Sequence, residues 1–433
     1  MTEDLIVLQY AKRFYFIEYY ALLLGAINKY SIVSQAQKEF IYQKNSHYLG
    51  LSRYRKISSN NEDGTLLKSK DKYEYTFSQV LLECKNFNLV EENKQLKNLS
   101  LTIDGEKLLE AYRTNKTQYK EILLQLMERK YTAFSYLLDK IYKISPKKSG
   151  LIIFPNYSPN DLGFTKSEFL TVETVHQYIE KYEQRIVDDI KKYINQNYEV
   201  TNETLELITE LKDKGYISDK SSDEFNLKKY NAVVRKTQVF WRNRLLKFYG
   251  ISSRWQSFEI WIYRAKQLGI LNTTPFYPDF LGQIIYPVAI ITKKEFLNNT
   301  NYKLVMNYKN EKFLYKRNVQ WETIENDFFN ELWNVYSELK KRNRINFLSL
   351  HNIKEIVCYN LKISYEQFSE FLNIAYEKSL NGNTSYSISL EADKLPEETN
   401  AIYIKREPIF VNGKNRNIIS LSYKGKDNEQ IHK

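Results

Sequence analysis

At three places the sequence changes from a helical hydrophobic pattern to two short apolar runs, and no other feature constrains the fold as tightly. The first place is residues 77–109. Apolar side chains recur at helical spacing over residues 77–84, and two short runs, 89–92 and 99–102, then surround a polar tip. A helical pattern resumes over residues 105–109. This order predicts a helix, a two-stranded hairpin and a closing helix.

A similar order follows in the middle of the chain. Residues 228–249 show helical periodicity, Gly250 stops that helix, and a second helix is expected over residues 254–268. Two apolar runs, 270–271 and 284–286, then surround a tip that contains proline and glycine. The middle of the chain therefore predicts two helices and a hairpin.

The third occurrence lies towards the C-terminal end of the sequence. One helix is expected over residues 350–361 and another after Ser364, which is a suitable N-cap. Three strands are expected to follow, over residues 386–390, 409–411 and 417–421. The dipeptide Asn412-Gly413 between the last two is a strong signal for a tight hairpin turn.

These units are separated by segments with helical periodicity. A chain of 433 residues is long for one core, and residues 144–163, with three prolines, are the best candidate linker. We predict a mainly α fold with small β-wings, of the α+β class, in which tandem helix-plus-wing units are joined by helical connectors. The predicted division is an N-terminal unit with a helical extension at 1–145, a linker and helical connector at 146–215, a basic central unit at 216–295, a helical connector at 296–345, and an acidic C-terminal unit at 346–433.

The positive charge of the chain is concentrated in residues 228–266. This stretch holds ten basic residues and one acid, Glu259, in a chain whose net charge is +12. Clustered positive charge among aromatic side chains is typical of a surface that binds nucleic acid. On the first helix of the stretch, Lys228, Arg235 and Arg242 recur every seven residues, away from the apolar face. An ordinary solvated face is the alternative, but acids that would pair with these cations are nearly absent.

The second helix of the stretch is the candidate recognition helix. Its expected outer face carries Gln256, Ile260, Tyr263 and Gln267. Glutamine can pair with adenine edges and arginine with guanine edges, although the same residues could also form the surface of a protein-interaction module. The candidate DNA-contacting residues are Lys228, Lys229, Arg235, Lys236, Arg242, Arg244, Lys247, Arg254, Gln256, Tyr263, Arg264 and Lys266.

All three units resemble the winged helix-turn-helix superfamily. The match is closest in residues 77–109, where Leu89-Val90 follows the helix and Leu101-Thr102 follows the tip. The resemblance implies tandem winged-helix domains, many of which bind duplex DNA while others bind only proteins. We expect the basic middle unit to bind double-stranded DNA. The third unit has seven acids and two lysines between residues 364 and 400, so it would hold a partner protein or pack on its own chain.

The first unit offers a weaker candidate surface for non-specific DNA contact. The expected outer residues of its helix are Ser78, Gln79, Glu83, Lys85 and Asn86, and its hairpin adds Lys94 and Lys97. Glu83 and Lys85 also form an ExK step, a spacing that nucleases use to hold a metal. That step falls within a helix whose Cys84 is expected to face inward, so a structural role is favoured.

No sequence pattern points to catalysis or to a cofactor. Glycine-rich phosphate loops, dinucleotide-binding glycine patterns and nucleophile elbows are absent from the sequence. Cys84 and Cys358 lie in apolar helical patterns, and the four histidines form no metal framework. We therefore expect a protein that is not an enzyme and that has neither cofactor nor metal. Three charged residues interrupt the apolar stretch 5–27, which predicts a core helix, no membrane span or signal, and a cytoplasmic location.

Three functions remain open at this point. The first is a non-catalytic DNA-binding protein, the DNA-sensing or targeting subunit of a multi-protein bacterial system such as anti-phage or anti-plasmid defence. The second is a kleisin-like assembly subunit of a condensin-type ATPase complex, since a winged-helix unit is expected near each end of the chain. The third is a cryptic metal-dependent nuclease.

Overall fold

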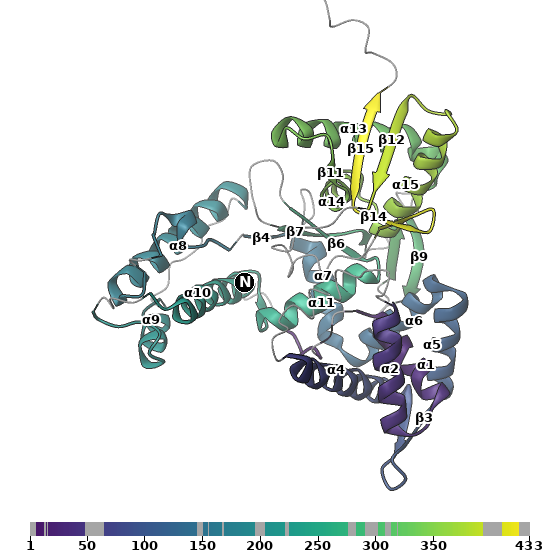
Figure 1. Ribbon diagram of the computed structural model, residues 1–433, viewed down its shortest axis with the longest axis horizontal. Coiled ribbons are helices and arrows are strands. Elements are labelled where there is room, and N and C mark those ends of the chain that lie inside the picture. Colours follow the sequence, from purple (N-terminus) through teal and green to yellow (C-terminus); the bar gives the residue numbers. More distant parts are fainter. Residues whose placement is uncertain are drawn as a thin grey trace, which may run out of the picture.

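The structure of the protein is a computed structural model. It describes residues 6–47, 65–144, 150–194, 204–220, 225–275, 283–290, 302–307, 313–317, 319–392 and 409–423, without residues 13, 15, 155, 167 and 168. The described residues form thirteen α-helices and several small sheets of two or three strands (Figure 1). The predicted mainly α, α+β fold class is confirmed at this level.

The first unit is built from three helices and a hairpin. The helices are α1 (Glu18–Lys29), α2 (Val33–His47) and α4 (Thr65–Asn86), and the hairpin strands are β2 (Val90–Asn93) and β3 (Asn98–Leu101). Ile32, between α1 and α2, forms an antiparallel bridge with Asn98, so the order across the small sheet is Ile32, β3, β2. The predicted closing helix is α5 (Ile103–Thr114), which Thr102 caps by accepting a hydrogen bond from the Gly105 N–H at 3.1 Å.

The middle unit has a sheet whose strands come from distant parts of the chain. Helix α7 (Thr132–Ile144) and strand β4 (Leu151–Ile153) come first, and α10 (Leu227–Phe248) and α11 (Trp255–Gln267) come much later. Strands β6 (Leu271–Pro275) and β7 (Gln283–Pro287) complete a sheet in the order β4, β7, β6. Two further helices, α8 (Val172–Tyr193) and α9 (Thr204–Asp213), lie between β4 and α10 in the sequence and form an arm with α10 (Figure 1).

The third unit repeats this plan. It consists of α13 (Trp321–Asn343), β11 (Leu348–Ser349), α14 (Leu350–Leu361), α15 (Tyr365–Leu380), β12 (Tyr386–Glu391) and β15 (Ile418–Tyr423). The strand order is β11, β15, β12. Asn412 and Gly413, with φ of 49° and 70°, form the predicted tight turn. That turn joins β13 (Ile409–Val411) to β14 (Lys414–Arg416), so the hairpin partner precedes the predicted strand at 417–421.

Two hydrophobic cores divide the described residues differently from the predicted five-part division. The first core contains residues from Leu8 to Ala289, and the second contains residues from Val319 to Leu421. The predicted boundary at 215/216 does not separate cores, because β4 pairs with β7 across it. The boundary at 145/146 does not separate cores either, because residues on both sides of it belong to the first core. The predicted boundary at 345/346 would separate α13 from the third unit, but α13 contributes buried residues to the core of that unit.

The remaining described elements are α6, a short 3₁₀ helix and two small sheets. Helix α6 (Lys116–Lys130) follows α5, a short 3₁₀ helix spans Asn160–Leu162, and a small sheet is formed by β8 (Ala289–Ile290), β9 (Tyr302–Asn307) and β10 (Phe313–Arg317). Strands therefore occupy part of the predicted helical connector at 296–345. Near the N-terminus, β1 (Ile6–Val7) pairs in parallel with β5 (Ile251–Ser252). This pairing ties the beginning of the described chain to the junction between α10 and α11.

Two glycines in the first unit should respond in opposite ways to replacement by alanine. A Cβ on Gly105 would overlap the backbone carbonyl oxygen of Leu89, so Gly105→Ala should lower the free energy of unfolding by about 1–3 kcal/mol. A Cβ on Gly25, in α1, first meets the flexible Gln43 side chain at 3.4 Å. Because alanine is the better helix former, Gly25→Ala should be neutral or stabilise by up to about 1 kcal/mol. Urea denaturation measures both effects, and equal losses would contradict this packing.

Candidate nucleic-acid interface

Helix α10 presents a row of exposed cations. The helix starts at Asn226, whose side-chain oxygen accepts hydrogen bonds from the backbone N–H groups of Lys228 and Lys229, each at 3.1 Å. Six of the candidate residues are exposed to solvent: Lys228, Lys229, Arg235, Lys247, Arg254 and Gln256. We call the five cations among them the α10 basic face; four lie on α10, and Arg254 lies just before α11. None of the five has an ion-pair partner within the described part of the chain.

Three further candidates are partly buried and have partners. The ammonium group of Lys236 lies 2.5 Å from a carboxylate oxygen of Glu210 in α9. The guanidinium of Arg242 lies over the Trp255 ring, 4.6 Å from its centroid, and burial lowers the pKa of this arginine. Lys266 donates a hydrogen bond to the Thr273 hydroxyl at 2.7 Å. These contacts reduce the charge that the three side chains can offer to an external phosphate.

Arg244 lies inside the arm rather than on its surface. Its guanidinium is 4.9 Å from the centre of the Trp241 ring and 3.9 Å from a carboxylate oxygen of Glu183 in α8. Burial raises the pKa of Glu183, while the nearby arginine opposes that rise. The expectation that Arg244 contacts DNA is therefore corrected: this cation links α10 to α8.

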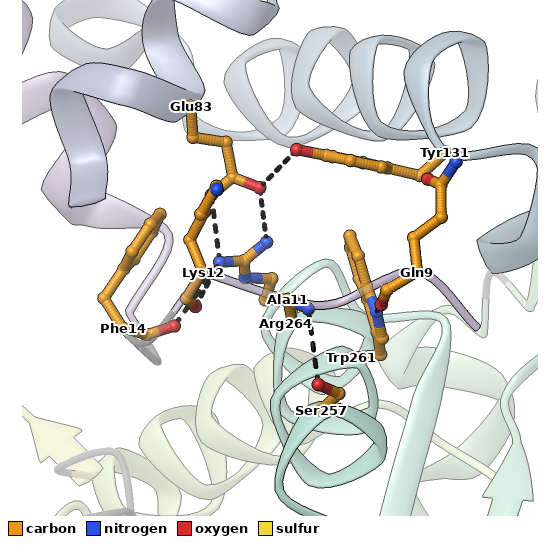
Figure 2. Close-up of polar contacts among 9 residues, drawn as sticks. All are labelled: Gln9, Ala11, Lys12, Phe14, Glu83, Tyr131, Ser257, Trp261 and Arg264. Carbon is orange, nitrogen blue, oxygen red and sulfur yellow. Dashed lines mark hydrogen bonds and ion pairs between the residues drawn. The ribbon is translucent and has the colours of Figure 1, made fainter. Parts of the chain in front are cut away.

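Arg264 is buried completely and binds Glu83 of α4. Both side chains have no exposed surface, and the two nitrogens Nη1 and Nη2 donate to Oε1 and Oε2 at 2.9 Å and 3.0 Å (Figure 2). Nη2 also lies 3.2 Å from the backbone oxygen of Lys12, and the Tyr131 hydroxyl donates to Glu83 at 3.0 Å. Arg264 cannot reach DNA in this arrangement, which corrects its assignment as a contact residue.

The predicted base-reading face of α11 is covered by the N-terminal segment of the chain. Gln267 accepts a hydrogen bond from the Ile17 N–H at 2.8 Å, and the Tyr263 ring packs edge-on against Phe16. Ile260 has 1% of its surface exposed. Of the predicted face only Gln256 remains exposed. A helix enclosed in this way cannot enter a DNA groove, so the recognition-helix interpretation of α11 does not hold for this structure.

The first unit keeps an outward helix face instead. On α4, Ser78 is exposed, and Tyr75 and Leu82 expose 44% and 43% of their surface. Glu83, expected on this face, points into the core. Sequence reasoning missed Tyr75 and Leu82, although their seven-residue spacing places them on one side of the helix. Lys94 and Lys97 are exposed at the hairpin tip, as expected.

The third unit packs on its own chain. The side-chain amide of Asn272, in β6, donates to the backbone oxygen of Ile363 at 2.9 Å, and the Tyr365 hydroxyl donates to the backbone oxygen of Thr273. Lys120 of α6 lies 3.3 Å from Glu366 of α15. One of the two roles expected for this unit is therefore present in the structure, and a partner protein stays a prediction.

Comparison with known proteins gives no further guide to the function. No protein-family model, no curated protein and no solved structure matches the chain. Within the described ranges, no group of three or more His, Cys, Asp and Glu side chains gathers as metal ligands would. The helices described by the structure are all too short or too polar to cross a bilayer.

The burial of Arg264 can be tested by replacing it and an exposed arginine in parallel. Arg264→Ala leaves Glu83 as an unpaired buried charge, so the free energy of unfolding should fall by about 3–5 kcal/mol. Arg254→Ala, at an exposed position nearby, should change it by less than about 0.5 kcal/mol. The double variant Glu83→Leu/Arg264→Met should recover most of the loss, because it removes both charges. Urea denaturation that gave Arg264→Ala and Arg254→Ala the same stability would contradict the buried pair.

Proposed function

We propose that the protein is a non-catalytic DNA-binding protein built from three winged-helix units. Among the described residues, each unit has a strand or bridge before two helices, and two paired antiparallel strands after them. In all three, the first strand pairs with the last, giving the same spatial order of first, third and second strand. This recurrence supports the winged-helix reading of the middle unit despite the two helices inserted after β4.

The observation that carries the proposal is the α10 basic face. Its five cations are exposed and lack ion-pair partners within the described residues, whereas most other cations of the middle unit are paired, stacked or buried. Helix α10 has 22 residues, so at about 1.5 Å per residue it extends roughly 33 Å, a length that spans many phosphates of a duplex. Contacts to phosphates alone favour binding without strong sequence preference.

The wider role is proposed from this binding activity. A DNA-binding chain with a polar, solvent-exposed arm would serve as the DNA-sensing or targeting subunit of a multi-protein bacterial system, such as anti-phage or anti-plasmid defence. The kleisin-like alternative requires end units that reach separate sites. Instead, Lys120 of α6 pairs with Glu366 of the third unit, and Asn272 of the middle unit binds Ile363 of the third unit. These contacts join the third unit to the rest of the described chain, which favours the first role.

The nuclease alternative receives less support from the described side chains. Both carboxylate oxygens of Glu83 are engaged, by Arg264 and by Tyr131. The carboxylate of the ExK step therefore has no lone pair directed towards solvent that would accept a metal. A plasmid-cleavage assay with magnesium and with manganese would test the point for the isolated protein.

Charge reversal on α10 tests the DNA-binding proposal. Lys228→Glu/Arg235→Glu changes two exposed cations on one side of the helix, and a glutamate in the first turn suits the helix dipole, so folding should be preserved. Affinity for a duplex should fall, and the slope of log K against log salt should become shallower by about 1.8, which corresponds to two lost phosphate contacts. Fluorescence anisotropy with a labelled duplex over a range of salt concentrations measures both quantities.

The control is Arg129→Glu/Lys130→Glu. These two exposed residues end α6, outside the middle unit, and their reversal changes the net charge of the protein by the same amount. The control should retain the affinity and salt slope of the wild-type protein. If the α10 variant also retains them, or if both variants lose affinity equally, the α10 basic face is not a specific DNA contact.

A further inference from the structure

The C-terminal end of α13 forms a solvent-exposed tip on the third unit. Every residue from 340 to 347 is exposed to solvent. We call these eight residues the α13 tip. Arg344 ends the helix in the left-handed region, with φ of 54°, and the Tyr336 hydroxyl donates to the backbone oxygen of Asn346 at 2.8 Å. The hydrogen bond from Tyr336 thus fixes the segment that follows the helix to the helix itself.

Four of the eight residues are cations: Lys340, Lys341, Arg342 and Arg344. Arg342 lies 3.7 Å from Glu338, both side chains being about half exposed, so this pair is weak. Lys341 and Arg344 have no acidic partner in the described part of the chain. The helix dipole accounts for one or two cations in the last turn, but it falls off beyond the helix end, where Arg344 lies. The cluster exceeds what stability of the helix requires.

Two large apolar side chains accompany these cations. Ile345 and Phe347 expose 52% and 51% of their surface on the same short segment. Isolated exposed apolar residues are common, but two of them directly after four cations on one exposed segment are not explained by packing. Proteins that enter the minor groove combine cations for the phosphates with apolar side chains that contact the groove interior. The tip has both kinds of side chain.

The rest of the third unit would repel a polyanion. Glu366, Glu370 and Glu377 are exposed along α15, the helix that would otherwise approach DNA. The start of that helix also packs against the middle unit through Tyr365. Of these two described surfaces, the end at which α13 stops is therefore more favourable for a nucleic acid than α15.

We propose that the α13 tip is a second nucleic-acid contact, which binds the sugar-phosphate backbone end-on. Lys341 and Arg344 neutralise phosphates, and Ile345 and Phe347 pack against the sugars of the groove. This inference rests on the proposed DNA-binding function and extends it to a unit whose overall charge pattern argued against such contact. The protein then holds one polyanion at two places, on the arm and on the third unit.

Lys341→Glu/Arg344→Glu tests the contact, with Arg129→Glu/Lys130→Glu again as the control. Both pairs lie at or just beyond a helix C-terminus and change the net charge equally, so a general charge effect or a loss of dipole stabilisation appears in both. For the tip variant alone, duplex affinity should fall and the salt slope should become shallower by about 1.8. Unchanged binding, or equal losses in the two variants, overturns the proposal.

Comparison with the α10 variant separates this inference from the proposed function. If Lys228→Glu/Arg235→Glu loses affinity while the tip variant does not, the inference alone fails. If the wild-type protein binds no duplex at any salt concentration, both fail. If the tip variant loses affinity while the α10 variant binds normally, the proposed contact at the α13 tip is supported and the assignment of the α10 basic face is wrong.

A second measurement distinguishes nucleic acid from a lipid surface. Ile345→Ser/Phe347→Ser removes the apolar pair at exposed positions, so folding should be retained. Weaker duplex binding by this variant supports the groove contact. If its duplex binding equals that of the wild type while the wild type alone sediments with vesicles of phosphatidylserine and phosphatidylcholine, the tip binds anionic membranes and the nucleic-acid proposal is overturned.

Discussion

The buried ion pair between Arg264 and Glu83 is the interaction on which the arrangement of the first two units depends. A charge without exposed surface is costly unless its partner and hydrogen bonds compensate for lost water. Here the guanidinium has two carboxylate contacts and a backbone oxygen, and the Tyr131 hydroxyl donates to the same carboxylate. Although burial acts against its charge, Glu83 keeps the pKa of Arg264 above its ordinary value. Separation of α4 from α11 would leave two unpaired charges, so these helices stay together.

This constraint changes what the middle unit can do. Helix α11 was the predicted recognition helix, but Trp261 donates its indole N–H to the backbone of Gln9 and packs against Tyr131 and Phe134. The helix is therefore the support on which the N-terminal segment, α4 and α7 assemble. Positive charge that is free to act outside the molecule remains on α10 and at its end. The function of the unit follows from the surface left exposed and not from its fold.

Local features were predictable from the sequence because they depend on neighbouring residues. The hairpin after α4 follows from the change in hydrophobic period. In the third unit, Asn412-Gly413 forms the turn between β13 and β14 because both residues tolerate positive φ. The pairing of β4 with β7 was not predictable, since the two strands are separated by the inserted helices of the arm. The sequence does contain one signal for the buried arginine: Trp261, Arg264 and Leu268 recur at helical spacing, so Arg264 lies within an apolar stripe.

The sequence showed that cations cluster on α10, but not which of them would be exposed to solvent. Lys236 and Arg244 have acidic partners on α9 and α8, and those helices lie earlier in the chain, where no local spacing rule connects them to α10. If only the acids close in sequence are counted, the unpaired positive charge of a basic helix is therefore overestimated, because acids on distant helices can pair with its cations in the folded protein. The same reasoning works in reverse for the third unit. Three exposed acids lie along α15, while four exposed cations gather at the C-terminal end of α13, so net charge alone conceals a surface of the opposite sign.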